Sequence, residues 1–224
     1  MAARLIRPGP TPGVDAGAPW AWSSARAWIV LFGVLVAALA LDLGSKRWAF
    51  ETVAPRPIEL DRAELTADPT HDPIGWHPTR TVLPGELMDF KLVLNPGAVF
   101  GVGANHRWFF VVFTITALSV AILVFGRATG PRDHFAHLAL GLVLAGGLGN
   151  LYDRLAFGRV RDFLHLLPGR HLPSGWTWPG TENPELLPWV FNIADLELLL
   201  GMLLLLTFLH WREKGKAAAV EARA

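Results

Sequence analysis

The sequence predicts a polytopic membrane protein with four transmembrane helices and a small β-sheet outside the bilayer. Two properties of the whole chain support this class: 52% of its 224 residues are hydrophobic, and only 17% are charged. A third is the choice of aromatic residues. The chain has ten tryptophans and one tyrosine, and many tryptophans lie where apolar runs end, at the headgroup level that indole rings favour.

Four segments are long and apolar enough to cross a bilayer, which takes about 20 residues per helix. We expect them at Trp28 to about Phe50, Trp108 to Phe125, about Phe135 to Leu151, and Trp189 to Trp211. A cleaved secretory signal is the alternative for the first segment, because basic residues precede it. That segment ends in Asp42 and Lys46 rather than in small residues, which favours a retained helix.

The positions of lysine and arginine predict the orientation of these helices. Basic residues near the helix ends fall into three groups: Arg4, Arg7 and Arg26; Arg127 and Arg132; and Arg212, Lys214 and Lys216. With four spans, all three groups share one side, and the positive-inside rule makes that side, with both termini, cytoplasmic. Arginines in the connection after residue 151 oppose this orientation, but long connections follow the rule weakly.

The predicted organisation is one membrane domain, residues 25–212, between two cytoplasmic tails. The first tail, residues 1–24, is rich in proline, glycine and alanine and is expected to be disordered; the second comprises residues 213–224. The two long connections, at about 51–107 and 155–188, are expected on the outer side.

Within the outer connections, composition separates loop from sheet. Residues 51–86 and 167–188 are polar or proline-rich and are expected to be irregular. Residues 87–102 contain short apolar runs around Asn95-Pro96-Gly97, a turn signal that predicts two strands. We expect this sheet to rest on the outer membrane surface.

Composition also excludes several functions. The net charge of +1 supplies no basic field for nucleic acid. The chain has no cysteine, so disulfides, thiolate zinc sites and cysteine nucleophiles are absent. His134 and His137 are three residues apart, but no acidic partner follows at ligand spacing, so we expect no metal and no other cofactor.

Charged residues inside apolar segments need an explanation, because each costs about 2.5–3.5 kcal/mol at the bilayer centre. Asp42 and Lys46 are four apart with the acid first, the favourable order for a helical ion pair. They form either a structural pair at the outer end of the first helix or part of a site.

The end of the third helix carries a second polar group. Gly141, Ala145 and Gly149 form a small-residue stripe that allows another helix to approach closely. Asp153 is expected to mark the water boundary. Asn150 and Arg154 lie beside the stripe and either join helices or belong to a site.

Two further aspartates stand out. Asp162 follows a helix break at Gly158, and a neighbouring arginine is one explanation for its charge. Asp195 lies near the start of a very apolar helix, one turn after Asn192, so both side chains project from one face. Glu197 is rotated by about 200° from Asp195 and has no predicted role.

Asp162 and Asp195 can meet at the same membrane depth. Two carboxyls a few ångströms apart cannot both ionise, so one pKa rises and the pair shares a proton. Such a pair activates water and protonates a leaving amine, as in aspartic proteases. The serines lack the nucleophile-elbow context that would indicate a serine hydrolase.

Four sequence blocks resemble, in order and spacing, the bacterial lipoprotein signal peptidases, also called signal peptidase II. The blocks are LDLGSK (41–46), LNPGAVFG (94–101), GGLGNLYDRL with GRVRDFL (146–164) and FNIADLELLLG (191–201). The resemblance implies a monomeric aspartic endopeptidase of the bacterial inner membrane, with its site near the outer face. Its partners would be membrane lipids and prolipoproteins, cleaved just before a diacylglyceryl-modified cysteine.

The resemblance also implies roles for individual residues. Asp162 and Asp195 would be the catalytic pair. The supporting positions would be Asp42, Lys46, Asn95, Gly146, Asn150, Arg154 and Asn192. Asparagines can hold a substrate backbone or orient a carboxylate, and an arginine can stabilise nearby charge. Residues 87–102 would form an extracytoplasmic β-sheet cradle over the substrate.

Some features depart from the family pattern. Arg161 precedes the catalytic aspartate and is expected to lower the pKa of Asp162. Pro96 lies inside the turn, Glu197 is unexpected, and both outer loops are long. A presenilin-like protease is an alternative suggested by Tyr152-Asp153, but its Gly-x-Gly-Asp block is missing. A transporter using Asp195 and Glu197 is another, but the paired halves typical of transporters are missing.

Overall fold

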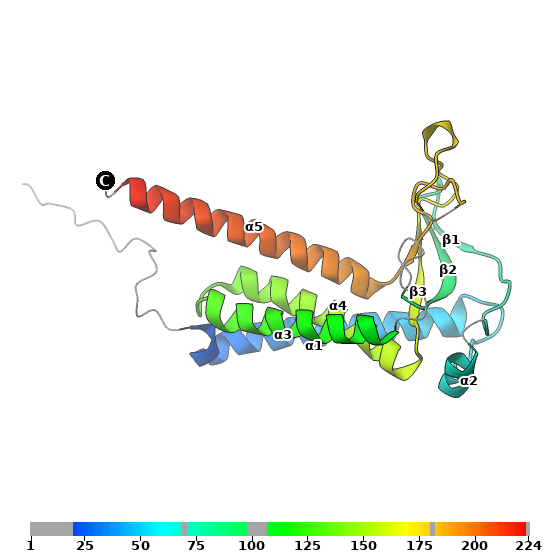
Figure 1. Cartoon of the computed structure of the whole chain (residues 1–224), viewed down its shortest axis with the longest axis horizontal. Coiled ribbons are helices and arrows are strands. Elements are labelled where there is room, and N and C mark those ends of the chain that lie inside the picture. Colours follow the sequence, from blue (N-terminus) through cyan, green and yellow to red (C-terminus); the bar gives the residue numbers. More distant parts are fainter. Residues whose placement is uncertain (1–19, 69–70, 98–106, 180–181, 223–224) are drawn as a thin grey trace, which may run out of the picture.

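The computed structural model describes residues 20–68, 71–97, 107–179 and 182–222. Within them, four helices are long and apolar enough to span a membrane: α1 (Ala25–Thr52), α3 (Arg107–Ala128), α4 (His134–Ala156) and α5 (Ile193–Glu221). Their axes follow one common direction in Figure 1. The predicted set of four spans is confirmed. Residues 1–19 of the predicted tail lie outside the described residues.

The last helix differs from its prediction at both ends. It begins at Ile193 rather than at Trp189, because Val190 and Phe191 form the short strand β4 and Asn192 caps the helix. It also continues to Glu221, through most of the segment 213–224 that was expected as a tail. Alanine and lysine are common in this extension and both favour helix.

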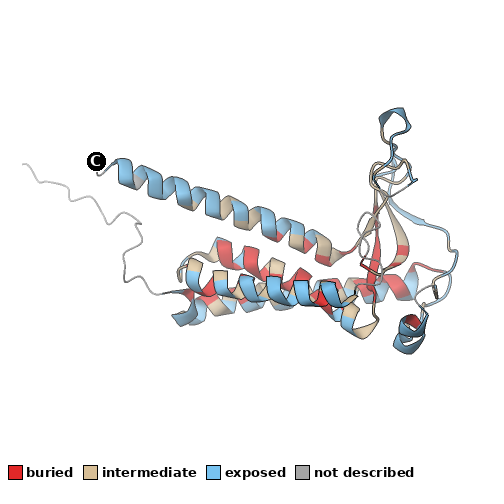
Figure 2. Ribbon diagram, viewed as in Figure 1, coloured by how far each residue is buried: buried red, intermediate tan, exposed pale blue. Residues whose placement is uncertain are grey.

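Helix α4 is the centre of the bundle and contacts α1, α3 and α5. Its small residues permit this: a Cβ added at Gly141 would lie 2.8 Å from Cβ of Val34 in α1. Burial concentrates on α4 and near the sheet, whereas α3 and α5 are largely exposed (Figure 2). Exposed leucines on α5, such as Leu203 and Leu206, fit a lipid-facing surface.

A four-stranded antiparallel sheet lies at one end of the helices. Its order is β1 (Arg80–Leu83), β2 (Met88–Asn95), β3 (Val160–Leu166) and β4 (Val190–Phe191). The strands run across the direction of the helices (Figure 1). Phe50 of α1, Leu92 of β2 and Phe163 of β3 belong to the apolar cluster between them. The sheet is therefore fixed to the end of α1.

The sheet contains segments that were not predicted to be part of it. Residues 51–86, expected as irregular, contain the helix α2 (Arg62–Ala67) and strand β1. Strand β3 was expected only as an apolar stretch, and it pairs Asp162 with Val93 of β2. The strand predicted after Gly97 lies outside the described residues. Residues 167–179 and 182–188 are mainly irregular, with a 3-10 helix at Pro173–Gly175.

Candidate active site

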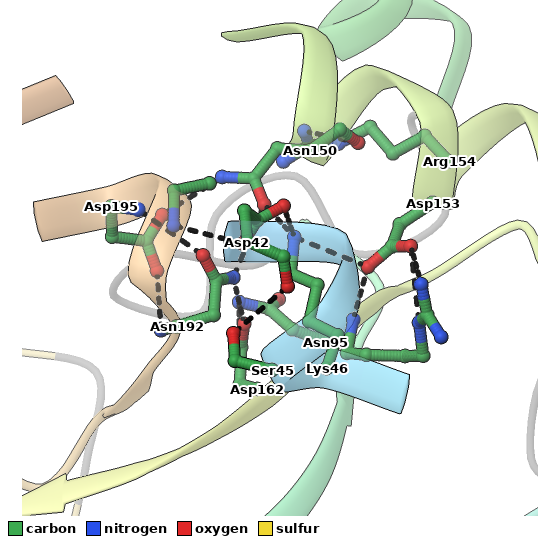
Figure 3. Close-up of polar contacts among 12 residues, drawn as sticks. Asp42, Ser45, Lys46, Asn95, Asn150, Asp153, Arg154, Asp162, Asn192 and Asp195 are labelled. Atoms are coloured by element: carbon green, nitrogen blue, oxygen red, sulfur yellow. Dashed lines mark hydrogen bonds and ion pairs between the residues drawn. The ribbon is translucent and has the colours of Figure 1, made fainter. Parts of the chain in front are cut away.

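The first turn of α5 is the point where polar side chains from several elements meet (Figure 3). The Asn192 Oδ1 accepts a hydrogen bond from the Asp195 amide at 3.1 Å, and the Asp195 Oδ2 accepts one from the Asn192 amide at 3.0 Å. Asp42 of α1 adds a third bond, from the Ala194 amide to its Oδ1 at 2.9 Å. These bonds satisfy donors that a helix start leaves free, and the helix dipole favours carboxylates there.

Asp162 reaches the same point from β3. Its Oδ1 accepts a hydrogen bond from Asn192 Nδ2 at 2.6 Å, and its Oδ2 accepts one from Asn95 Nδ2 at 3.0 Å. Asn95 is held by the turn after β2, where its Oδ1 accepts from the Gly97 amide at 2.8 Å. Asn192 therefore binds both aspartates: Asp162 through its side chain, and Asp195 through the reciprocal cap.

The two aspartates have different surroundings. Asp162 is 2% exposed, whereas Asp195 is half-buried. Burial is the main reason that the pKa of Asp162 rises to about 7, and the charge of Asp195 raises it further. Hydrogen bonds from Asn192 and Asn95 act in the opposite direction. Asp162 is therefore partly protonated at neutral pH.

The predicted effect of Arg161 on Asp162 is wrong. Adjacent side chains on a strand point to opposite faces, so the Arg161 guanidinium turns away from Asp162. It binds Asp153, with Nη2 2.7 Å from Oδ1. The pKa of Asp162 rises instead of falling.

Lys46 lies among the polar side chains near the first turn of α5 and is completely buried. Its Nζ lies 2.9 Å from Asp42 Oδ2, 2.9 Å from Asn150 Oδ1 and 3.3 Å from Asp153 Oδ2. Asn150 in turn donates from Nδ2 to Asp195 Oδ1 at 2.9 Å. Asp42 and Lys46 form the expected ion pair, and this pair contacts Asn150 and the first turn of α5.

The prediction that Asp153 marks the water boundary is wrong. It has no exposed surface. It accepts three hydrogen bonds from Arg161 and forms an ion pair with Lys46. The chain turns after α4 into strand β3, and Arg161 of this strand contacts the carboxylate. This is a tertiary contact, which local polarity does not predict.

A cavity of about 240 Å³ lies beside Asp195, between α3, α4 and α5. Its walls are mainly apolar, and its polar lining residues are Thr114, Asn150, Arg154 and Asp195. Arg154 donates from Nη1 to the Asn150 carbonyl at 3.2 Å, and its guanidinium lies 5.3 Å from the centre of the Phe110 ring. Its charge interacts with Asp195 and Asp162.

The sequence profile of the family described as signal peptidase (SPase) II matches residues 34–211. The chain belongs to the signal peptidase II family. It is 38% identical over 138 residues to a lipoprotein signal peptidase of Symbiobacterium thermophilum, covering 61% of this chain and 78% of that protein. It is 30% identical over 161 residues to one of Ectopseudomonas mendocina, covering 70% and 86%.

The fold also matches solved structures. One, described as a bacterial membrane enzyme, aligns with a TM-score of 0.56 and 24% identity, covering 83% of this chain and 90% of that one. At this identity the likeness concerns the fold. The profile match and the four apolar helices together make the chain a bacterial membrane protein of the signal peptidase II family, and membership of that family makes it a peptidase.

The structure brings the predicted site residues into one region. Gly146 contributes by its size: a Cβ there would contact the Ala194 carbonyl oxygen and lie 2.9 Å from Leu198 Cγ. It lets α5 approach α4, which places Asn192 and Asp195 beside Asn150. Among the described residues, no group of three or more histidine, aspartate or glutamate side chains is arranged to hold a metal ion.

For two buried acids, the sequence predicted no role or the wrong one. Asp153 was wrongly expected at the water boundary. The opposite charge of Arg161, eight residues later, was a signal in the sequence that these two side chains could pair between α4 and β3. Glu197 is 6% exposed, and neither carboxyl oxygen has a hydrogen-bond partner in the described part of the chain. It projects from the same helix end but takes no part in the bonds around Asn192.

Proposed function

We propose that this chain is an aspartic endopeptidase that removes signal peptides from diacylglyceryl-modified prolipoproteins, cleaving before the lipidated cysteine. One observation carries the proposal: Asn192 bonds to both Asp162 and Asp195, and Asp195 opens into a largely apolar cavity within the helices. Family membership supports the class of substrate, and the paired carboxyls support the chemistry.

The two aspartates take different roles in this proposal. Asp195 accepts hydrogen bonds at both carboxyl oxygens, from the Asn150 side chain and from the Asn192 amide, and it lines the cavity. As the general base, it takes a proton from a water that attacks the scissile carbonyl carbon. Asp162, which holds a proton near pH 7, donates to the carbonyl oxygen. As this intermediate collapses, one hydroxyl returns its proton to Asp162, the C–N bond breaks, and the proton gained by Asp195 passes to the leaving amine.

The surroundings of the pair support the same reaction. Arg154 lines the cavity and interacts with both carboxyls, so it can stabilise the negative charge that develops on the carbonyl oxygen. The apolar walls, including Phe113, Leu118 and Val143, suit the apolar residues of a signal peptide. A substrate entering from the bilayer would meet Asp195 without crossing water.

The proposal includes an orientation. The sheet end of the molecule, with Asp162 and Asp195, faces the outer side of the bacterial cytoplasmic membrane, and both termini are cytoplasmic. Arg127 at the end of α3 and the basic residues after Trp211 support this orientation. The protein works as a monomer without a cofactor, and its partners are prolipoproteins and membrane lipids.

The test is cleavage of a diacylglyceryl-modified lipobox peptide by the full chain in proteoliposomes. Asp162→Asn and Asp195→Asn should each abolish cleavage while membrane insertion and thermal unfolding stay close to wild type. Asp72→Asn is the matched control, because Asp72 is exposed and asparagine preserves its bond to the Ile74 amide. Retained cleavage in either dyad variant would refute the mechanism.

The substrate class has its own control. The same peptide with an unmodified cysteine should be cleaved far more slowly, because it lacks the acyl chains that hold it at the membrane. Equal cleavage of both peptides would contradict the requirement for the lipid while leaving the dyad intact.

A further inference from the structure

Arg161 and Asp153 form a buried contact next to the proposed catalytic pair. Arg161 is 7% exposed and Asp153 is fully buried. Three hydrogen bonds join them: the Arg161 backbone amide to Oδ2 at 3.0 Å, Nε to Oδ1 at 3.1 Å and Nη2 to Oδ1 at 2.7 Å. The guanidinium fork suits this arrangement, whereas an ammonium is a point charge.

The same carboxylate also attracts Lys46. The Lys46 ammonium lies 3.3 Å from Asp153 Oδ2 but closer, at 2.9 Å, to Asp42 Oδ2 and to Asn150 Oδ1. Arg161 therefore neutralises much of the negative charge of Asp153, and the Lys46 ammonium remains nearer to Asp42 and Asn150. The position of the ammonium reflects this competition between two cations for one acid.

The position of Lys46 affects Asn150, which contacts the proposed base. Asn150 Oδ1 accepts from Lys46 and, at 3.1 Å, from Asn192 Nδ2. These bonds fix the amide so that its Nδ2 faces Asp195 Oδ1 at 2.9 Å. A displacement of Lys46 would remove one of the two bonds that orient this amide.

We propose that Arg161 is a positioning residue for the cleavage reaction, acting through Asp153 and Lys46 on the amide of Asn150. The inference rests on the proposed function, because it assigns Asp195 to catalysis. Without the guanidinium, Asp153 has Lys46 as its remaining cationic contact among the described side chains. The ammonium then moves towards Asp153 and away from Asn150, and Asp195 loses an oriented donor.

The test compares Arg161→Met, Arg161→Lys and the double variant Asp153→Asn/Arg161→Met in the peptide cleavage assay. Arg161→Met should lower kcat by roughly 10-fold to 100-fold, the range for residues that orient active-site groups, with KM little changed. Arg161→Lys should recover part of the loss. The double variant should recover most of it, because the neutral amide no longer draws Lys46 away from Asn150.

If Arg161 only holds β3 against α4, the opposite result is expected for the double variant. Losing both partners would then leave it no more active than Arg161→Met, and this result would overturn the inference. The pH profile provides a second readout: it should change shape in Arg161→Met and return in the double variant. If Arg161→Met does not fold, the double variant decides: activity supports the inference, and a folded, inactive protein refutes it.

Two controls separate this inference from the proposed function. Arg159→Met removes a nearby arginine that bonds to the carbonyls of His71 and Asp68, so it should alter stability without changing the pH profile. Asp162→Asn and Asp195→Asn are assayed alongside. If these retain activity, the proposed function fails; if they are inactive while the double variant shows no recovery, only the role of Arg161 fails.

Discussion

Replacing Gly146 with alanine tests how closely α5 must approach α4 for the site to form. The added Cβ would lie 2.9 Å from Leu198 Cγ, 3.2 Å from the Ala194 carbonyl carbon and closer still to the Ala194 oxygen. Leu198 can change rotamer, but the Ala194 carbonyl is backbone and cannot rotate away. The first turn of α5 must therefore move as a unit.

The substitution is expected to lower both stability and activity. Inserting a methyl group into a packed interior costs about 1–3 kcal/mol. Ala194 lies between Asn192 and Asp195, so a shift of roughly 1 Å moves one carboxyl of the proposed pair and costs on the order of 100-fold in rate. This loss corresponds to about 2.7 kcal/mol of transition-state stabilisation.

The assay is kcat and KM for the lipid-modified peptide, with thermal unfolding measured on the same preparations. Gly33→Ala is the matched control, since Gly33 lies on α1 and a Cβ there would have no atom within 4 Å. It should retain wild-type activity and unfold no earlier than wild type. Wild-type kcat in Gly146→Ala would show that the helices accommodate the methyl group without moving the site, and the reasoning would fail.

Two further predictions concern buried acids. The cleavage rate should fall as pH rises through about 7, where Asp162 loses its proton, and a rate independent of pH between about 5 and 9 would contradict this role. Since the folded chain holds that proton longer than the unfolded chain, the unfolding free energy should decrease from about pH 4 to about pH 7, and Asp162→Asn should remove this decrease. Glu197→Leu should raise the unfolding free energy by about 1–3 kcal/mol, because a buried carboxyl without hydrogen bonds is lost. Glu221→Leu, on an exposed part of α5, is its control; a destabilised Glu197→Leu would mean that this acid is stabilising.

The helices were predictable because a bilayer sets a minimum length for an apolar segment. The ends of α5 were harder to predict. The apolar residues Trp189 to Phe191 lie close to the apolar run of the helix. Their pairing with β3, Val190 with His165 and Phe191 with Leu164, makes this segment a strand. Strand pairing depends on residues far away in sequence, so local composition does not reveal it.

In the candidate site, too, local sequence predicted some features, whereas others depend on residues far away in the chain. Asp162 and Asp195 could be identified individually, since a carboxyl in an apolar segment is costly. Their environment could not. Arg161 was assigned to Asp162 because they are adjacent in sequence, but the alternation of a strand directs it to Asp153, a carboxylate on the preceding helix. Side-chain direction became clear only with the pairing of β2 and β3.

The capping box at Asn192 links insertion of the last helix to assembly of the proposed catalytic pair. Asp195 is both the residue that closes the first turn of α5 and one of the two acids. A chain in which α5 has not yet entered the bilayer therefore has Asp162 without Asn192 and Asp195 beside it. Such a chain would lack the proposed pair, which would form in a single step as α5 inserts.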